Sequence, residues 1–203
     1  MTPTGMKIFV DANVLMSRTV RDWLCLLRVE SAGGMFTLVT SEDVLAEVEY
    51  HVRRQFPEAD GEVIVKLRSK IVSSFDEVLT GFIGNLENPT NDPNDQHVHC
   101  GAIASSADIL LTNDSGFLKL ESEVLDSLEY EVMTPDCLFV LIDDSASRLV
   151  RKTAVRQMAY WQDKSTHSSL LVSLRASQCE DFAERVEVHL KSLSGVTAKQ
   201  TQF

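Results

Sequence analysis

The chain has 203 residues, of which 44% are hydrophobic and 24% charged, and its formal net charge is −11. This length suffices for one domain with a real core, and the hydrophobic fraction excludes a wholly disordered chain. Taken as a total, the negative charge argues against a nucleic acid as partner. The charge is uneven, however. Residues 1–140 hold 10 Lys and Arg against 23 Asp and Glu, whereas residues 141–203 hold 9 against 7.

Targeting and redox features point to the cytoplasm. No apolar run approaches the roughly 20 residues of a membrane span, and the first residues lack a signal-peptide pattern. We therefore expect a cytoplasmic protein without a membrane partner. The four cysteines are widely spaced, which favours reduced thiols over a disulfide framework or a zinc site.

Strands and helices alternate along the first 140 residues. In chain order, the patterns predict a strand over 6–11, a helix over 18–31, a strand over 36–40, and helices over 41–56 and 61–83. They then predict a loop over 86–92, a helix from Asp92 to about 106, a strand over 108–112, a strand within 127–134, and a helix from Pro135. This alternation is typical of an α/β fold with a mainly parallel sheet. Two further helices, over 146–161 and 177–193, form a mildly basic helical tail.

Four carboxylates stand where strands end or helices begin. Asp11 ends the first strand, Glu47 lies on the helix after the second, Asp95 lies in the first turn of a helix, and Asp114 follows the third strand. A parallel sheet brings such positions to one edge. Clustered carboxylates raise one another's pKa unless a cation is present, and oxygen ligands suit Mg²⁺ or Mn²⁺. Such ions activate water and stabilise the charge on a phosphodiester.

Two of the four acids have neighbouring rivals. The helical wheel places Glu47 and Glu49 on either side of the apolar stripe and does not choose between them, although Glu49 can pair with Arg53 one turn later. Asp92 competes with Asp95, but Asp92 is well explained as the residue that caps the helix.

The motifs DANVL, Ser41–x5–Glu47 and DPNDQHVHCGAIASSADILLTND resemble those of PIN-domain ribonucleases. The resemblance is greatest to the VapC-type toxins of bacterial toxin–antitoxin pairs. It covers residues 6–140, and it implies a Rossmann-like PIN domain there, with residues 141–203 as a C-terminal helical extension packed on it. It also implies a Mg²⁺- or Mn²⁺-dependent RNA endonuclease, a cognate antitoxin as inhibitor, and a homodimer.

The resemblance also assigns the site. It selects Glu47 over Glu49 and Asp95 over Asp92, and it makes Asp11, Glu47, Asp95 and Asp114 the catalytic, metal-binding acids. The polar Asn13 and Thr112 match positions that support such a site. Two alternative functions remain: a non-catalytic PIN-like interaction or RNA-binding protein, and a phosphatase of another doubly wound type. The haloacid-dehalogenase pattern needs an aspartate at position 13, where this chain has asparagine.

Basic residues supply candidate RNA contacts. Arg148, Arg151, Lys152 and Arg156 form one face of a tail helix, which is either solvated or in contact with RNA phosphates. Four further candidates are Arg18, Arg21, Arg53 and Arg54. His97 and His99 are two residues apart and face different ways on a helix, so we expect packing or solvent-facing histidines rather than a shared metal site.

Overall fold

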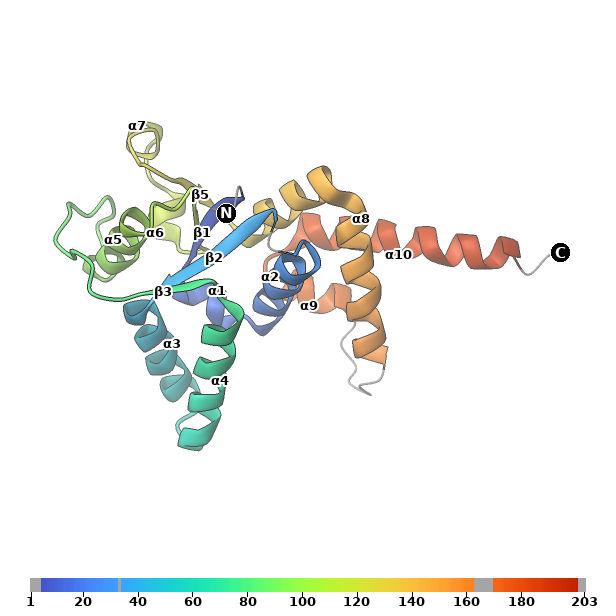
Figure 1. The fold of residues 1–203 in the computed structure, drawn as a ribbon, viewed down its shortest axis with the longest axis horizontal. Helices are drawn as coiled ribbons and strands as arrows, with labels where there is room; N and C mark the ends of the chain where they lie inside the picture. The colour runs from blue at the N-terminus through green and yellow to red at the C-terminus, as the bar shows by residue number, and fades with distance from the viewer. Residues whose placement is uncertain (1–4, 33, 163–169, 201–203) are drawn as a thin grey trace.

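The computed structural model describes residues 5–32, 34–162 and 170–200, and its centre is a five-stranded parallel sheet. The strand order is β3-β2-β1-β4-β5, which confirms the expected α/β fold with a parallel sheet flanked by helices (Figure 1). The strands are β1 (Met6–Val10), β2 (Phe36–Ser41), β3 (Glu77–Leu79), β4 (Ile109–Leu111) and β5 (Glu131–Met133).

Helices cover the sheet and extend the chain beyond it. The first group is α1 (Ala12–Met16), α2 (Arg18–Glu30), α3 (Glu42–Gln55) and α4 (Gly61–Ser74). The second group is the 3-10 turn η1 (Pro93–Asp95), α5 (Gln96–Ala104), α6 (Ser115–Leu118) and α7 (Ser122–Leu125). The C-terminal group is α8 (Pro135–Gln162), α9 (Leu170–Ala176) and α10 (Glu180–Gln200). None of the described helices is long and apolar enough to cross a membrane.

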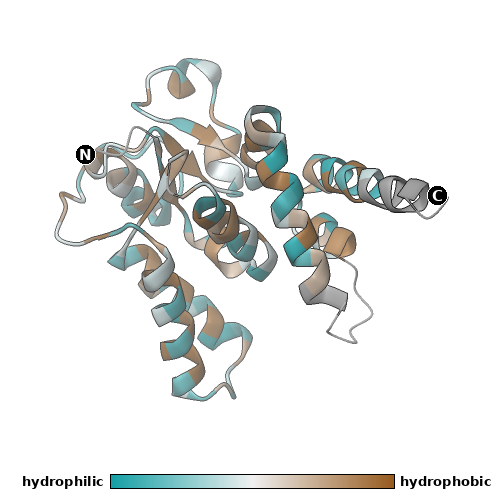
Figure 2. Cartoon of the chain, turned by 45° about the vertical axis from the view of Figure 1, so that its right-hand side comes forward, coloured by the Kyte–Doolittle hydropathy of each residue, from teal (hydrophilic) through white to brown (hydrophobic). Residues whose placement is uncertain are grey.

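The core lies between the central strands and the inner faces of the helices. Ile8, Phe9 and Val10 of β1 are fully buried, as are the residues of β4 beside them. Central parallel strands are covered on both faces, which explains the apolar runs at residues 8–10 and 109–111. The helices instead alternate teal and brown in Figure 2, as expected of amphipathic elements with one face in the core.

The expected helix over 61–83 is wrong at its C-terminal end. Helix α4 stops at Ser74, and residues 77–79 form the edge strand β3 beside β2. Phe75 and Leu79 continue the apolar spacing of the helix, so the periodicity concealed the boundary. Asp76 marks it instead, because its carboxylate accepts a hydrogen bond from Leu38 N at 2.8 Å and its own N–H donates to Leu38 O at 2.9 Å.

Other differences are smaller. The sequence patterns did not predict the short helices α1, α6, α7 and α9, because a segment of four to seven residues is too short to show a helical repeat of apolar residues. The two helices expected from Pro135 and over 146–161 are the two parts of α8, which are separated by the non-helical Ala146 (φ −145°, ψ 52°). Helix α8 therefore runs across the expected boundary at residues 140 and 141.

The ion pair between Arg28 and Asp76 fastens α2 to the start of the edge strand. Arg28 donates from both Nε and Nη2 to the Asp76 carboxylate, and these bonds hold the pKa of Asp76 below its ordinary value. The Asp76→Asn variant is expected to lower the free energy of unfolding by about 1 to 2 kcal/mol at pH 7. Since a depressed folded-state pKa stabilises above the unfolded value of 3.8, the difference should persist from pH 7 to about 4 and vanish as pH falls through the folded-state pKa.

Urea unfolding of both proteins across this pH range measures the difference. Glu62→Gln is the matched control, because Glu62 forms only an exposed i,i+4 pair with Lys66. If Asp76→Asn were no less stable at pH 7 than this control, the ion pair would contribute nothing to the strand edge.

The C-terminal helices pack against the sheet domain through an aromatic cluster. The Phe182 ring lies 4.9 Å from Trp23 of α2 in a T-shaped arrangement and 4.9 Å from Phe139 of α8. The carboxylate of Asp136 accepts hydrogen bonds from the first N–H groups of α10, including Phe182 N at 2.9 Å. The extension is thus joined to the domain by buried apolar contacts and a capped helix.

Truncating Phe182 tests how tightly the extension is joined to the domain. The Phe182→Ala variant is expected to lose about 3 to 4 kcal/mol of unfolding free energy, because the side chain is fully buried among other rings. Val188→Ala serves as the control, since Val188 lies on the same helix and is 65% exposed. Denaturation should remain a single transition in both; a separate early transition of the extension would show that it folds on its own.

Candidate active site

The site lies where the direction of the strand order reverses. Strands β1 and β4 are neighbours, and the chain leaves their carboxyl ends toward helices that lead to opposite sides of the sheet. Such a position is where open parallel sheets bind ligands. Asp11 directly follows β1, and Thr112 directly follows β4.

Asp11 is held by a dense set of hydrogen bonds. Its Oδ2 accepts from Thr112 Oγ1 at 2.6 Å and from Asn13 Nδ2 at 2.5 Å, while its Oδ1 accepts from Ala12 N at 2.5 Å. Thr112 Oγ1 in turn accepts from Asp114 N at 2.9 Å, and Asn13 Oδ1 accepts from Asn113 N at 2.9 Å. Asn13 and Thr112 therefore orient the Asp11 carboxylate and tie the loop after β4 to it.

Burial and neighbouring acids make Asp11 a weak acid. Burial, together with the nearby carboxylates of Glu47 and Asp114, raises its pKa to about 6, although the hydrogen bonds from Thr112 and Ala12 oppose this shift. Burial also raises the pKa of Asp95, with Asp114, Asp92 and Glu47 contributing. The structure thus brings all four acids, which the sequence scatters over more than 100 residues, into one electrostatic cluster.

Asp95 and Asp114 converge on Gly116. Asp95 is the last residue of η1, directly before α5, and its carboxylate accepts a hydrogen bond from Thr90 Oγ1 at 2.7 Å. Asp114 caps α6, and its carboxylate accepts a hydrogen bond from Gly116 N at 2.6 Å. A Cβ placed on Gly116 would lie 2.8 Å from Asp114 Oδ1 and 2.8 Å from Asp95 Oδ2. The glycine therefore leaves room for two carboxylates to face the same point.

Glu47 is flanked by two histidines. His97 Nε2 lies 3.2 Å from its Oε2, and His51 Nε2 lies 3.3 Å from its Oε1. The contact with His97 lowers the pKa of Glu47, and the same contact raises the pKa of His97. His97 is thus part of the acidic cluster, and the expectation of a mere packing or solvent-facing residue is wrong for it.

The rival acids have other roles. Glu49 pairs with Arg68 of α4 at 3.1 Å, so the expected pair with Arg53 is wrong. Asp92 caps the turn before α5, as expected, by accepting from Asn94 N at 2.9 Å. His99 packs in the core and contacts Tyr130.

The donor set suits a hard cation. It consists of carboxylate oxygens, which Mg²⁺ and Mn²⁺ prefer, and the charges of Glu47 and Asp114 contribute to the raised pKa values of Asp11 and Asp95. Within residues 5–32, 34–162 and 170–200, no three acid, histidine or cysteine side chains are grouped closely enough to hold one ion as they stand. Metal binding would require small side-chain movements, with water completing the ligand shell.

A comparison with protein-family models matches residues 7–116 to the PIN domain. The match covers more than half of the chain. The chain belongs to the PIN-domain family. No curated protein matches it. PIN domains are in general nucleases, which are hydrolases that act on nucleic acid, commonly RNA, and they usually use divalent metals.

The candidate RNA-contacting residues of this PIN protein occupy different settings. Arg53 and Arg54 are exposed on α3, whereas Arg21 is half-buried and donates to Leu15 O. Arg18 lies 3.6 Å from Asp22. On α8, Lys152 and Arg156 both pair with Glu30, at 2.6 Å and 3.0 Å, while Arg148 and Arg151 are exposed. The four basic residues of α8 therefore do not form one basic face that is open to RNA, because two of them are paired with Glu30.

Some residues of the PIN site escaped sequence reasoning. His51 follows Glu47 by four residues on a helix, so that contact was readable from spacing. Thr90 and Gly116 carried no local signal, because their roles depend on where the loop before α5 and the start of α6 meet.

Proposed function

We propose that this PIN protein is a Mg²⁺- or Mn²⁺-dependent endoribonuclease that hydrolyses RNA phosphodiester bonds. The observation that carries the proposal is the cluster of Asp11, Glu47, Asp95 and Asp114. These acids come from four separate segments at one edge of the sheet, and Glu47 and Asp114 help to raise the pKa of both Asp11 and Asp95. Purely structural acids are placed apart or beside cations, because close like charges destabilise a fold.

The chain's own residues would divide the work. Asp11, Asp95, Asp114 and Glu47 would hold the cation, and Thr112, Asn13 and Thr90 would keep those carboxylates oriented. Because the contact with His97 lowers the pKa of Glu47, this side chain would stay ionised as a ligand. The bound ion would supply stabilisation of the negative charge that develops on the phosphate and would lower the pKa of water.

A groove leading away from the acids offers a path for the RNA backbone. A cavity of about 380 Å³ is lined by Asn13, Glu47 and Arg54, and a second of about 730 Å³ continues from it between α2 and α4. The two share Met16 and Gln55. The second cavity is lined by four cations and a single acid: Arg18, Arg21, Lys66, Lys70 and Asp22. We propose that phosphates lie here, which would reconcile a net charge of −11 with RNA binding.

Two unpaired cations of the groove test this path. Within the described part of the chain, Arg54 and Lys70 make no ion pair, so replacing both by alanine should cost little stability. RNA binding should weaken, and the slope of log affinity against log salt should fall by about 1 to 2. The control is Arg148→Ala with Arg151→Ala. Loss in the α8 control alone would move the RNA path to α8, and no loss in either double variant would refute the groove.

The biological setting proposed for the enzyme is that of a toxin. We propose a cytoplasmic VapC-like nuclease that is held inactive by a cognate antitoxin and works as a homodimer, and we keep residues 6–140 as the nuclease domain with 141–203 as its extension. These proposals rest on the sequence resemblance. Purification with and without the protein encoded by a neighbouring gene, followed by light scattering, tests both partners.

The decisive experiment measures RNA cleavage with a defined metal. Purified protein is stripped with EDTA and incubated with end-labelled single-stranded RNA after addition of Mg²⁺, Mn²⁺, Ca²⁺ or no metal. Cleavage that needs Mg²⁺ or Mn²⁺ supports the proposal. RNA binding without cleavage under every metal condition would instead favour the non-catalytic interaction protein. Release of phosphate from a phosphomonoester, with RNA left intact, would favour a phosphatase.

A further inference from the structure

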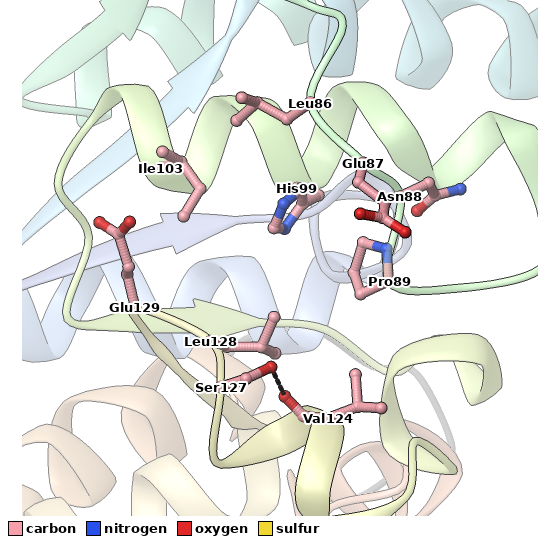
Figure 3. A pocket seen from close by; sticks show the side chains of 10 residues that line it. All are labelled: Leu86, Glu87, Asn88, Pro89, His99, Ile103, Val124, Ser127, Leu128 and Glu129. Carbon is pink, nitrogen blue, oxygen red and sulfur yellow. Dashed lines mark hydrogen bonds between the residues drawn. The ribbon is translucent and has the colours of Figure 1, made fainter.

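A cavity of about 550 Å³ shares no lining residue with the two cavities of the groove described above. Figure 3 shows it between helix α5, the loop before that helix and the segment that leads from α7 to β5. None of the four clustered acids lines it. Its volume is in the range of small-molecule sites, and it is not explained by the proposed hydrolysis.

The cavity has apolar walls and a few polar groups. The apolar side chains come from all three segments and could cover the faces of a flat ring. They are Leu86, Pro89, Ile103, Val124 and Leu128. The carboxylates of Glu87 and Glu129 also line it, so a phosphate is disfavoured inside and an amino group is favoured.

His99 supplies a hydrogen-bond donor that faces the cavity. The residue is 8% exposed, and its Nδ1 lies 2.7 Å from Tyr130 Oη. Burial raises the pKa of Tyr130 and lowers that of His99, so both are neutral at pH 7. The buried tyrosine hydroxyl has His99 Nδ1 as its only hydrogen-bond partner among the described residues, so it donates there. The proton of the neutral imidazole is then on Nε2, which is left to donate to a ligand in the cavity.

The cavity is connected to the acid cluster in two ways. His99 follows Asp95 by four residues, so the two side chains lie on the same side of the chain about 6 Å apart along the helix axis. The loop provides the second connection, since Asn88 of the cavity wall accepts from Thr90 N at 3.2 Å, and Thr90 donates to Asp95. A ligand bound to His99 would lie about one helical turn from the Asp95 carboxylate.

We propose that this cavity binds one nucleobase of the RNA, next to the phosphate that is cleaved, and that it selects a base with an exocyclic amine. The proposal rests on the proposed nuclease function. A ring nitrogen or carbonyl oxygen accepts from His99 Nε2, the amine donates to Glu87 or Glu129, and the apolar walls cover the ring. Bases splayed out of single-stranded RNA are recognised by such a combination of apolar cover and edge hydrogen bonds. Adenine, cytosine and guanine meet the requirement, and uracil does not.

Two measurements test the cavity independently of each other. In the first, the four ribonucleosides are titrated at millimolar concentration into the metal-free protein, and the amide and His99 ring signals are followed by NMR. In the second, cleavage sites are mapped on an RNA library that is randomised around one position. Ser127→Trp fills the cavity from an exposed position, and Ser122→Trp adds the same bulk on α7 outside it.

The expected result is binding of at least one amine-bearing nucleoside with shifts at His99 and Leu128, and weaker or no binding of uridine. Wild type and Ser122→Trp should prefer an amine-bearing base at one position flanking the cut by about tenfold, and Ser127→Trp should lose both the binding and the preference. Cleavage without nucleoside binding, or with the preference intact in Ser127→Trp, overturns the base pocket and leaves the nuclease standing. Nucleoside binding without RNA cleavage under any metal condition overturns the nuclease and, with it, the role of the cavity as a substrate subsite.

Discussion

Replacing Asp11 by asparagine is expected to reduce RNA cleavage by at least about 10³-fold while the fold remains intact. The substitution removes the most buried of the four carboxylates and keeps its size. An amide cannot accept from Thr112, Asn13 and Ala12 at once and cannot neutralise a cation, so metal binding should weaken as well. Initial rates on labelled RNA at saturating Mn²⁺ measure the effect, and circular dichroism checks the fold.

The same variant should not be less stable without metal. A carboxyl group whose pKa is raised to about 6 by folding contributes stability that is fully present below its unfolded-state pKa of 3.8 and is lost as pH rises from there through 6. At pH 8 in EDTA, wild type thus bears the full cost of a buried charge beside Glu47 and Asp114. Asp11→Asn should melt at the same temperature or higher there.

Asp92→Asn is the matched control for Asp11→Asn. Asparagine caps helices as well as aspartate does, and Asp92 lies three residues from Asp95 without converging on Gly116. Its cleavage rate should stay within a few-fold of wild type. Comparable cleavage by Asp11→Asn with trace metal excluded, or a loss in Asp92→Asn as large as in Asp11→Asn, would contradict the assignment of the site.

Replacing Gly116 by alanine is expected to lower cleavage by about 10²-fold with little change in stability. The new methyl group would lie 2.8 Å from one oxygen of Asp95 and one of Asp114, so both carboxylates must move apart. Carboxylate ends move easily, which keeps the cost in folding small. They are nevertheless the groups that would hold the cation, and a displacement of about 1 Å is sufficient to impair catalysis.

The mutant's metal dependence distinguishes this cause from unfolding. The concentration of Mn²⁺ needed for half-maximal cleavage should rise in Gly116→Ala, while the melting temperature in EDTA stays near that of wild type. Ser115→Ala is the control, because Ser115 is exposed on the same short helix. An unchanged rate and an unchanged metal requirement in Gly116→Ala would show that the two carboxylates do not act on a common ion.

Local patterns were reliable where the sequence itself contains the physical cause. Asp92 caps the turn before α5, as its position predicted, and Ser41 likewise caps α3 by accepting from Val44 N. The apolar runs of β1, β2 and β4 are buried on both faces, which is why they read clearly as strands. Helix α4 was overextended for the opposite reason: Phe75 and Leu79 fit a helical spacing, but Asp76 binds the backbone of Leu38, which lies 38 residues away.

By itself, the sequence determined the α/β class, the parallel sheet, the placing of Asp11, Asp95 and Asp114 at element ends and that of Glu47 on the helix after the second strand, because periodicity, caps and strand-end acids are local properties. Only the tertiary structure decided that these acids share one electrostatic environment, that His97 contacts Glu47 while Glu49 pairs with Arg68, and that Gly116 leaves room for two carboxylates. These outcomes depend on contacts between segments far apart in the chain. The effect of the net charge depends on them too, because some of the excess acids form the proposed metal site, whereas lysine and arginine side chains line a separate groove that is proposed for RNA.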